Sequence, residues 1–314
     1  MKVLICGLGS IGLRHLKNLQ KLSIKKKNIK IFKTNRGLKK NNTKGIKIFY
    51  DLKEALLEKP RMAIICNPTH MHIPTAIKCA ENKLHIFIEK PLSHNKSGLK
   101  KILQIQKKNK IKIMIGYMMR FHPIILKIKS LLKKKYIGRI YHFKMHWGEY
   151  LPNWHKNEDY KKGYAANKSM GGGVALTLSH DLDLSYFLFG KIVKCYCKKN
   201  KLNFLKIKSE SSVDFMLSHT NNITGNIHLD YIQKKPERFI QIYGEKGKLE
   251  MNYYKKSLNI VKKNINKNIK FKNFQRNDLF LDEMKYFLNC VKRNIKPAPN
   301  LHDSIYVLKK TKLI

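Results

Sequence analysis

Up to residue 115, short runs of apolar residues alternate with longer segments in which apolar side chains recur at every third or fourth position. The short runs are typical of buried strands, and the longer segments are typical of amphipathic helices. Regular alternation of the two predicts a parallel, doubly wound sheet with helices on its faces. We expect strands at residues 3–6, 29–33, 46–49, 62–66, 85–88 and 111–115, with helices beginning near residue 10 and covering 51–58, 73–81 and a segment up to about 109.

The second half of the chain carries another series of strand-like segments. Its Lys- and Asn-rich part, residues 255–272, has a weak pattern, and we expect an irregular excursion there. We expect strands at 140–147, 213–217, 225–231, 239–243 and 249–253, a tight turn at 245–248 and a helix from residue 278.

The first predicted strand runs directly into a G-x-G-x-x-G turn, and a helix pattern follows. In this order Gly7 permits the tight turn, Gly9 lets the backbone approach a pyrophosphate, and Gly12 lets the helix pack closely on the strand. The first amides of the helix, with Ser10 and Ile11 beside them, would bind the phosphates. A glycine-rich turn without a ligand is the alternative, but the strand and helix on its two sides favour dinucleotide binding.

The residues after the second predicted strand select between the two nicotinamide cofactors. An Asp or Glu about 20 residues past the glycines would bind the ribose hydroxyls of NAD, and none is present. Thr34, Asn35 and Arg36 instead offer a hydroxyl, an amide and a guanidinium, which suit a 2′-phosphate. Arg36 could equally be a solvated loop residue. The sequence therefore favours NADP and leaves NAD open.

Composition narrows the classes of function. The chain has 314 residues, enough for two domains, and 66 basic against 20 acidic residues give a net charge of +46. Nucleic-acid binding is the obvious suspicion, but only eight basic residues are arginines and the lysines are spread along the whole chain, so we expect no nucleic-acid partner. No apolar run is long enough for a membrane span, and the immediate first strand leaves no room for a signal peptide, so a cytoplasmic protein is expected. Cys195 and Cys197 lack a second pair, so no metal is expected.

Four ordered motifs identify a family. Besides the glycine turn, these are Glu89-Lys90-Pro91 at a predicted strand end, GYMMRF at 116–121, and the glycine-rich segment 171–183 that contains a histidine. Together they resemble the Gfo/Idh/MocA oxidoreductases over most of the chain. The resemblance implies a Rossmann domain at 1–120 and a substrate-binding α/β domain at 121–314 with an open, mostly antiparallel sheet. It also implies homo-oligomers, dimers or tetramers, formed through the exposed sheet face.

The chemistry that the resemblance implies is hydride transfer between a sugar carbon and the nicotinamide. Lys90 would hold the reacting oxygen, and His180 would take the hydroxyl proton, because histidine is the side-chain type suited to proton transfer near neutral pH. Asp183, three residues on, could orient the imidazole, although a core histidine capped by this aspartate is the alternative. Many family members carry an aspartate four residues before the histidine, where this chain has Leu176.

Further binding residues are assigned from the ends of predicted strands and from the resemblance. In a doubly wound sheet, ligands bind beyond the carboxyl ends of the strands. The cofactor set adds Asn67, Pro68, His72, Glu89 and Lys90 to the residues named above, and the substrate set is Lys90, Tyr117, Arg120, Trp154, His155, Tyr164, Thr177 and His180.

The function expected from the sequence is that of an NAD(P)-dependent sugar or sugar-nucleotide dehydrogenase or reductase. The segment around Trp154 is similar to family members in surface-polysaccharide and sialic-acid-like sugar pathways. The family's glycosidase-type chemistry, in which a tightly held NAD is transiently reduced and regenerated, is one alternative. A cofactor-binding protein without turnover is another.

Overall fold

The computed structural model describes residues 1–34, 43–154 and 159–314, which form two compact units. Unit 1 comprises residues 1–117 and 276–305, and unit 2 comprises residues 118–275 and 306–314. The chain thus returns to unit 1 after residue 275, a crossing that the two domain ranges expected from the sequence do not contain.

Unit 1 is built on a six-stranded sheet in the order β3-β2-β1-β4-β5-β6, and every pair of neighbours is parallel. The prediction of a parallel, doubly wound sheet is confirmed. The chain adds strands on one side of β1 and then crosses to β4 on the other side, so the order switches between these two strands. The strands are β1 Val3–Cys6, β2 Ile29–Phe32, β3 Lys47–Phe49, β4 Met62–Ile65, β5 His85–Glu89 and β6 Ile113–Gly116.

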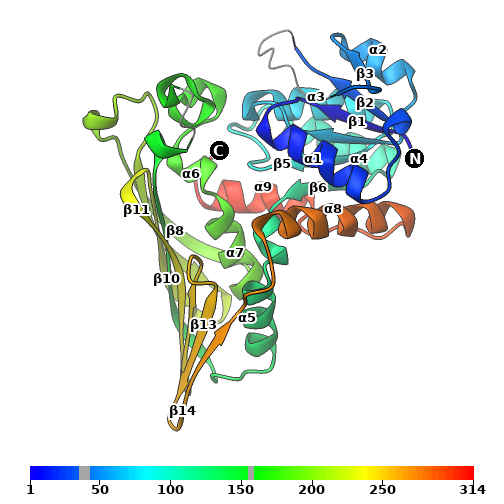
Figure 1. The fold of residues 1–314 in the computed structure, drawn as a ribbon. Coiled ribbons are helices and arrows are strands. Elements are labelled where there is room, and N and C mark those ends of the chain that lie inside the picture. The colour runs from blue at the N-terminus through cyan, green and yellow to red at the C-terminus, as the bar shows by residue number, and fades with distance from the viewer. Residues whose placement is uncertain (35–42, 155–158) are drawn as a thin grey trace. The chain divides into compact units, whose positions relative to one another are not determined.

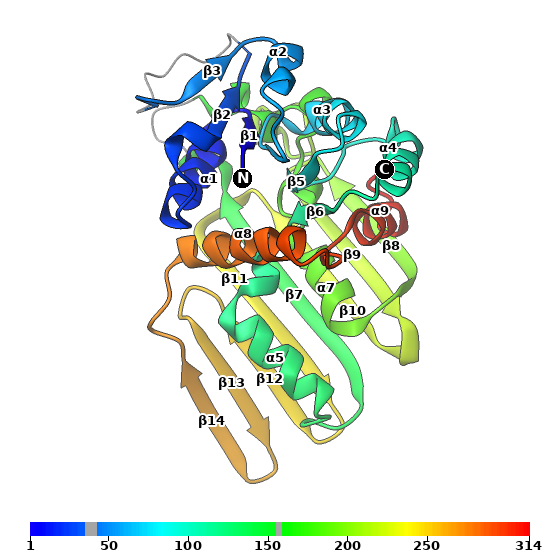
Figure 2. The same cartoon turned by 90° about the vertical axis from the view of Figure 1, so that its right-hand side faces the viewer.

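Helices flank this sheet, with α1 beside α8 and α3 beside α4 (Figure 1, Figure 2). Helix α8 contacts α1 through a hydrogen bond of 2.9 Å from Asn277 Nδ2 to Asn18 Oδ1, a contact between residues far apart in the sequence. The helices are α1 Ser10–Lys21, α2 Leu52–Leu57, α3 Thr69–Glu81, α4 Leu99–Asn109, α8 Arg276–Lys292 and α9 Leu301–Lys310, which ends in unit 2, with the 3₁₀ turn η1 Lys26–Asn28.

Unit 2 is built on an eight-stranded sheet in the order β14-β13-β12-β11-β7-β10-β9-β8. Only β7 and β10 pair in parallel, so the expectation of a mostly antiparallel sheet is confirmed. The strands are β7 Ile140–Tyr150, β8 Ile192–Asn200, β9 Ser212–His219, β10 Thr224–Asp230, β11 Ile232–Gly244, β12 Gly247–Asn252, β13 Ser257–Lys262 and β14 Ile265–Lys270.

The segment expected to be an irregular excursion forms the hairpin β13–β14 instead. Leu258 and Ile260 of β13 are buried, which supplies the alternation of a strand with one buried face. The edge strand β14 carries Lys267 and Lys270, and exposed lysines on an edge strand discourage pairing with other chains. The weak sequence pattern therefore belongs to an edge strand.

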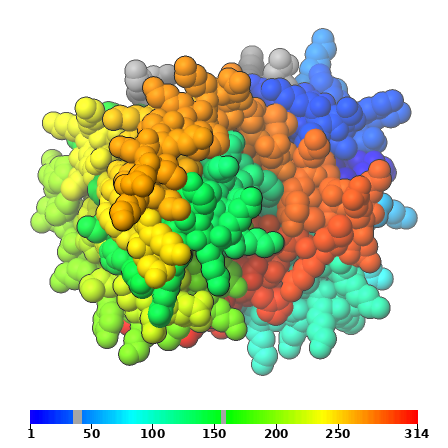
Figure 3. Space-filling model, turned by 90° about the horizontal axis from the view of Figure 1, so that it is seen from below, coloured from blue at the N-terminus to red at the C-terminus, as the bar shows by residue number. Residues whose placement is uncertain are grey.

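Helices cover one face of the unit 2 sheet, where α5 and α7 cross the strands (Figure 1, Figure 2). Seen from below, α5 lies directly against the yellow and orange strands of this unit (Figure 3). Phe143, Trp147 and Phe215 belong to the buried side of these strands. The helices are α5 Pro123–Lys133, α6 Val174–Thr177 and α7 His180–Phe189, with 3₁₀ turns η2 Met118–Phe121, η3 Leu151–Asn153, η4 Tyr160–Lys162, η5 Tyr164–Ala166, η6 Lys168–Met170, η7 Asn203–Leu205 and η8 Thr220–Asn222.

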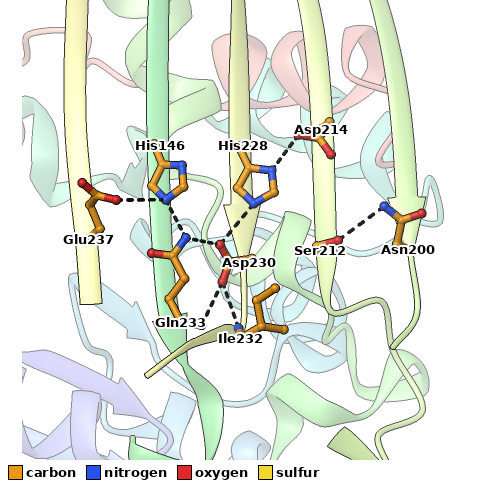
Figure 4. A network of polar contacts seen from close by, with 9 residues as sticks. All are labelled: His146, Asn200, Ser212, Asp214, His228, Asp230, Ile232, Gln233 and Glu237. Atoms are coloured by element: carbon orange, nitrogen blue, oxygen red, sulfur yellow. Dashed lines mark hydrogen bonds and ion pairs between the residues drawn. The ribbon is translucent and has the colours of Figure 1, made fainter. Parts of the chain in front are cut away.

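The other face of the unit 2 sheet carries a polar network (Figure 4). The rings of His146 and His228 stack with centroids 5.1 Å apart. His228 contacts two carboxylates, Asp214 at 2.6 Å and Asp230 at 3.1 Å, and Gln233 donates to Asp230 at 2.6 Å. Within the described ranges, no helix is long and apolar enough to cross a membrane, and no group of three or more His, Cys, Asp or Glu side chains is arranged to hold a metal ion.

Candidate active site

The glycine turn after β1 has three glycines in three different environments. Gly7 has φ +98°, and a Cβ there would lie 2.6 Å from the backbone nitrogen of Asn67. A Cβ on Gly12 would overlap the carbonyl oxygen of Gly7. Around Gly9, in contrast, no described atom beyond its chain neighbours lies within 4 Å of the Cβ position. The fold itself requires Gly7 and Gly12, whereas Gly9 leaves open space of the kind that a closely bound pyrophosphate needs.

The helix behind this turn begins without a side-chain cap. Helix α1 starts at the exposed Ser10, Gly9 precedes it, and the described side chains form no capping hydrogen bond and place no acidic group in the first turn. The first amides and the positive end of the helix dipole therefore remain available to an anion. These observations fit a dinucleotide phosphate.

The loop after β4 supplies Asn67, Pro68 and, in the first turns of α3, His72. Pro68 is exposed, and Asn67 Nδ2 donates to Thr75 Oγ1 at 2.9 Å. His72 is only 2% exposed, and its Nδ1 and Nε2 lie 2.8 Å from the carbonyl oxygens of Pro91 and Asn67. Its ring thus connects the loop after β4 to the loop after β5.

The end of β5 places Glu89 and Lys90. Glu89 is buried, and its Oε1 lies 2.7 Å from Nε2 of the fully buried His15 in α1. Its Oε2 accepts a hydrogen bond of 3.3 Å from the backbone nitrogen of Lys90, whose side chain is partly exposed. A Cβ on Gly116, at the end of β6, would lie 3.3 Å from the Glu89 carboxyl carbon. Gly116 thereby leaves room for the carboxylate beside Lys90.

The histidine on α7 lies in a buried aromatic and charged environment in unit 2. His180 is 3% exposed, and its ring centroid lies 6.0 Å from that of Trp147. Arg120 binds both oxygens of Asp183, from Nε at 2.8 Å and from Nη2 at 2.7 Å. A fork of this kind fixes the first turns of α7, and it gives Asp183 and Arg120 each a partner that the sequence did not indicate.

A second buried pair anchors the same helix. Arg238 donates from Nη2 to Asp181 Oδ2 at 2.9 Å, and its guanidinium carbon lies 3.8 Å from the ring centroid of Trp147. Burial raises the pKa of Asp181, and Arg238 opposes that shift. Asp181 and Arg238 were not among the predicted site residues, because no local pattern connects positions 57 apart.

The glycine-rich segment before α7 shapes the backbone that leads to His180. Gly173 has φ +108°, and a Cβ there would overlap the carboxylate of Glu210. That carboxylate accepts a hydrogen bond of 3.3 Å from the backbone nitrogen of Ala175 at the start of α6. Leu176 and Thr177, the last residues of α6, are buried at 8% and 2% exposure. An apolar, buried side chain therefore lies four residues before His180.

The aromatic residues predicted to bind substrate occupy different environments. Trp154 packs edge-on against the fully buried Tyr231, with ring centroids 5.4 Å apart. Burial raises the pKa of Tyr231 well above its usual range. Tyr164 is 38% exposed, whereas Tyr117, which ends unit 1, is 1% exposed.

The structure brings the predicted residues of unit 1 to one edge of its sheet. The glycine turn and Asn67 follow the carboxyl ends of β1 and β4, and Glu89 and Gly116 are the last residues of β5 and β6. Thr34 is exposed directly after β2. Lys90 belongs to unit 1, while Arg120, Trp154, Tyr164, Thr177 and His180 belong to unit 2. Asn35, Arg36 and His155 lie outside the described residues.

Comparison with known proteins assigns the same class to both halves of the chain. Residues 1–117 match an oxidoreductase family with an NAD-binding Rossmann fold, and residues 125–250 match the GFO/IDH/MocA C-terminal domain. Together the two matches define a Rossmann-fold oxidoreductase. The chain belongs to the Gfo/Idh/MocA family, as its ordered motifs indicated.

Some individual relatives match nearly the whole chain and others only part of it, all at low identity. Myo-inositol 2-dehydrogenase of Thermotoga maritima is 23% identical over 96% of this chain and 92% of its own length. A structure of levoglucosan dehydrogenase with NADH and levoglucosan superposes with a TM-score of 0.88 at 17% identity, covering 100% of this chain and 96% of that one. The 2,7-anhydro-N-acetylneuraminate hydratase of Escherichia coli is 28% identical over 41% of this chain and 33% of its own length.

Proposed function

We propose that this protein transfers a hydride between a nicotinamide dinucleotide and a hydroxyl-bearing or keto carbon of a sugar or sugar nucleotide. The observation that carries the proposal is the open space at Gly9 beside an uncapped helix, at the sheet edge that also presents Lys90. The dehydrogenases of inositol and levoglucosan among the relatives support a polyol or sugar as the substrate.

The proposed cofactor site uses the residues at the carboxyl ends of the unit 1 strands. Backbone amides after Gly9 bind the pyrophosphate, and the loop from Asn67 to Pro68 lies beside it. A bound nicotinamide supplies the carbon that accepts or donates the hydride.

Two side chains carry the proton chemistry in this proposal. The ammonium group of Lys90 donates a hydrogen bond to the reacting oxygen and stabilises negative charge that develops there. The imidazole of His180 takes the hydroxyl proton during oxidation and returns it during reduction. Thr177, Trp154 and Tyr164 line the sugar, the threonine through its hydroxyl and the aromatic rings through stacking.

The variants Lys90→Ala and His180→Ala test this assignment. Each is expected to lower kcat at least about 100-fold, the usual contribution of a positioned acid or base, while NADH and NADPH still bind. Full turnover in either variant would remove that residue from the mechanism. Lys96→Ala, at an exposed lysine of the same unit, is the control and should leave turnover unchanged.

A defined panel tests the substrate class. The net charge of +46 attracts anions, which supports sugar nucleotides or acidic sugars of a surface-polysaccharide or sialic-acid-like pathway. UDP-N-acetylglucosamine and N-acetylneuraminate should show higher kcat/KM than myo-inositol and levoglucosan, with an advantage that shrinks as salt rises. A neutral polyol as the best substrate, without salt dependence, would show that the charge steers no substrate.

The family's other chemistry makes a different prediction about the cofactor. One relative is a hydratase, and adding water to a substrate needs no net oxidation or reduction, so an enzyme of that kind would have to regenerate any nicotinamide that it used within each turnover. Such an enzyme would convert substrate without net change of added NADH or NAD, whereas the proposed dehydrogenase consumes one cofactor per product. A protein that binds the cofactor and converts no member of the panel would support the non-catalytic alternative.

Oligomerisation is a further part of the proposal. We expect a dimer or tetramer through the polar face of the unit 2 sheet, where Tyr196 and Met216 are paired across strands and are 69% and 66% exposed. Exposed large side chains side by side are common at subunit interfaces. Light scattering of wild type and Met216→Lys checks this expectation, and a wild-type monomer would contradict it.

A further inference from the structure

Each of the two chain neighbours of Lys90 contacts a different buried histidine. On one side, Glu89 contacts His15 at 2.7 Å. On the other side, the carbonyl oxygen of Pro91 lies 2.8 Å from Nδ1 of His72. The two histidines are 0% and 2% exposed, so water does not compete for either contact. The backbone that presents Lys90 is therefore fixed from both directions.

The second nitrogen of His72 has an equally short contact. Its Nε2 lies 2.8 Å from the carbonyl oxygen of Asn67 in the loop after β4. That loop passes close to the glycine turn, since a Cβ on Gly7 would lie 2.6 Å from the Asn67 nitrogen. A single imidazole thus joins the cofactor side of the sheet edge to the lysine side.

The contacts of His72 with the Pro91 and Asn67 carbonyls need a proton on different ring nitrogens. A carbonyl oxygen only accepts hydrogen bonds, so each ring nitrogen must carry a proton to hold its partner, and a neutral ring carries one. Burial lowers the pKa of His72, the two carbonyls and Glu89 raise it in part, and the neighbouring His70 lowers it. Near neutral pH the ring therefore has one proton for two carbonyl acceptors. Substitution of His72 can remove the Nδ1 contact or the Nε2 contact separately.

We propose that His72 is a positioning residue whose one ring proton bonds either the Pro91 carbonyl, beside Lys90, or the Asn67 carbonyl of the cofactor loop, so that its two tautomers hold these two loops in turn. The proposal rests on the function proposed above for Lys90. It gives His72 a task different from direct cofactor binding, because both of its ring nitrogens point at the protein's own backbone.

Two substitutions divide the contacts. The amide nitrogen of asparagine reaches about the position of Nδ1 and can still donate to Pro91, whereas that of glutamine reaches about the position of Nε2 and can still donate to Asn67. His72→Asn should keep the lysine contact and lose the cofactor-loop contact. His72→Gln should do the reverse. His70→Asn, at an exposed histidine two residues away, is the matched control.

The first readout needs no substrate. The full-length protein is labelled with acetic anhydride over a range of pH, and the acetylation rate of Lys90 is followed by peptide mass spectrometry. Dissociation constants for NADH and NADPH come from their fluorescence. We expect the acetylation rate of Lys90 to change at least about threefold in His72→Gln and to stay unchanged in His72→Asn. The affinity for NADH and NADPH should change in His72→Asn and stay unchanged in His72→Gln. Turnover at saturating cofactor should fall about tenfold or more in His72→Gln, because small displacements of a catalytic group are costly.

Each other outcome overturns the proposal. Equal effects of the two variants on Lys90 and on cofactor affinity would show that the two contacts do not act separately. An unchanged Lys90 rate in both would show that the histidine does not position it. Loss of the folded state in both variants would assign His72 to the stability of unit 1 as a whole. Failure of the proposed function is seen separately, as full turnover in Lys90→Ala, and leaves the labelling result standing.

Discussion

Arg120 holds both carboxylate oxygens of Asp183, at 2.8 and 2.7 Å, with side-chain exposures of only 7% and 2%. The pair connects η2, at the start of unit 2, to α7, whose first residue is His180. Both charges are almost fully removed from water, so neither can be left alone without a large penalty. The contact therefore fixes the helix turn that carries the proposed proton acceptor.

Arg120→Ala should lower the free energy of unfolding by about 3–5 kcal/mol, because it leaves the buried Asp183 charge without its partner. Arg120→Lys should recover only part of the loss, since an ammonium cannot form the two-pronged contact. Urea denaturation measures both effects. Arg139→Ala, at an exposed arginine of the same unit, should change stability little, and equal stability of the Arg120 and Arg139 variants would contradict the assignment.

The glycine turn gives a prediction that separates binding from folding. Gly9 has φ −74°, which alanine adopts readily, and a Cβ there meets open space. Gly9→Ala should therefore keep its Tm but bind NADH at least about tenfold more weakly, because the methyl group occupies the pyrophosphate position. Gly12→Ala should lose about 1–3 kcal/mol of stability through overlap with Gly7. Unchanged affinity in the folded Gly9 variant would place the phosphates elsewhere.

The sequence predicted the features of this chain that depend on local sterics. The strand before Gly7 and the glycine turn both follow from residues within a few positions of one another. The parallel order of unit 1 follows from the alternation of strands and helices.

Contacts between distant residues could not be predicted. Arg120 and Asp183 are 63 positions apart, and His15 and Glu89 are 74 apart, so only the folded backbone brings them together. The hairpin β13–β14 was not predicted for a related reason, because pairing of β13 with β12 stabilises a segment that has little sequence pattern of its own. Sequence reasoning thus located the strand ends that present the proposed site residues and missed the charged pairs formed between distant positions.

Cofactor selection is expected to depend on Arg36, which lies outside the described residues. NADPH should bind at least several-fold more tightly than NADH, because no acidic residue follows β2 and a guanidinium can pair with the 2′-phosphate. Arg36→Ala should remove most of the difference, since a hydrogen bond to a charged group is worth about 1.5–3 kcal/mol. Arg61→Ala, at an exposed arginine of unit 1, is the control. Equal affinities in the wild type would rule the preference out.

Introducing the aspartate that the family resemblance led us to expect at position 176 tests the apolar position in α6. Leu176 is 8% exposed, so Leu176→Asp buries a charge and should reduce stability by several kcal/mol at neutral pH. Because burial favours the protonated carboxyl, the folded variant binds a proton more tightly than the unfolded one, and its loss of stability should shrink on acidification. The asparagine of Leu176→Asn has the same shape as the aspartate but no charge, so this variant should lack that pH dependence. An increase in kcat with unchanged stability would show that the position can accept the carboxylate.

The network on the open face of the unit 2 sheet predicts a loss of stability in mild alkali (Figure 4). Hydrogen bonds with Asp230 and Asp214 raise the pKa of His228 to about 9, and its partial burial opposes this rise only in part. Since the folded pKa lies above the unfolded value of about 6.5, the stabilisation is complete below about pH 6.5 and disappears as the pH rises through about 9. We expect a decrease of about 2 kcal/mol, reduced by water around the exposed Asp214.

Urea denaturation between pH 6 and 10 measures this decrease. His228→Asn removes the titrating group and should flatten the curve over that range. His142→Asn, at a histidine of the same face whose pKa is lowered and which contacts Thr224 at 3.5 Å, should retain the slope of the wild type. A wild-type curve that is already flat, or one that stays steep in His228→Asn, would assign the alkaline loss to other groups. The slope therefore distinguishes the carboxylate-bound histidine from its neighbour on the same sheet face.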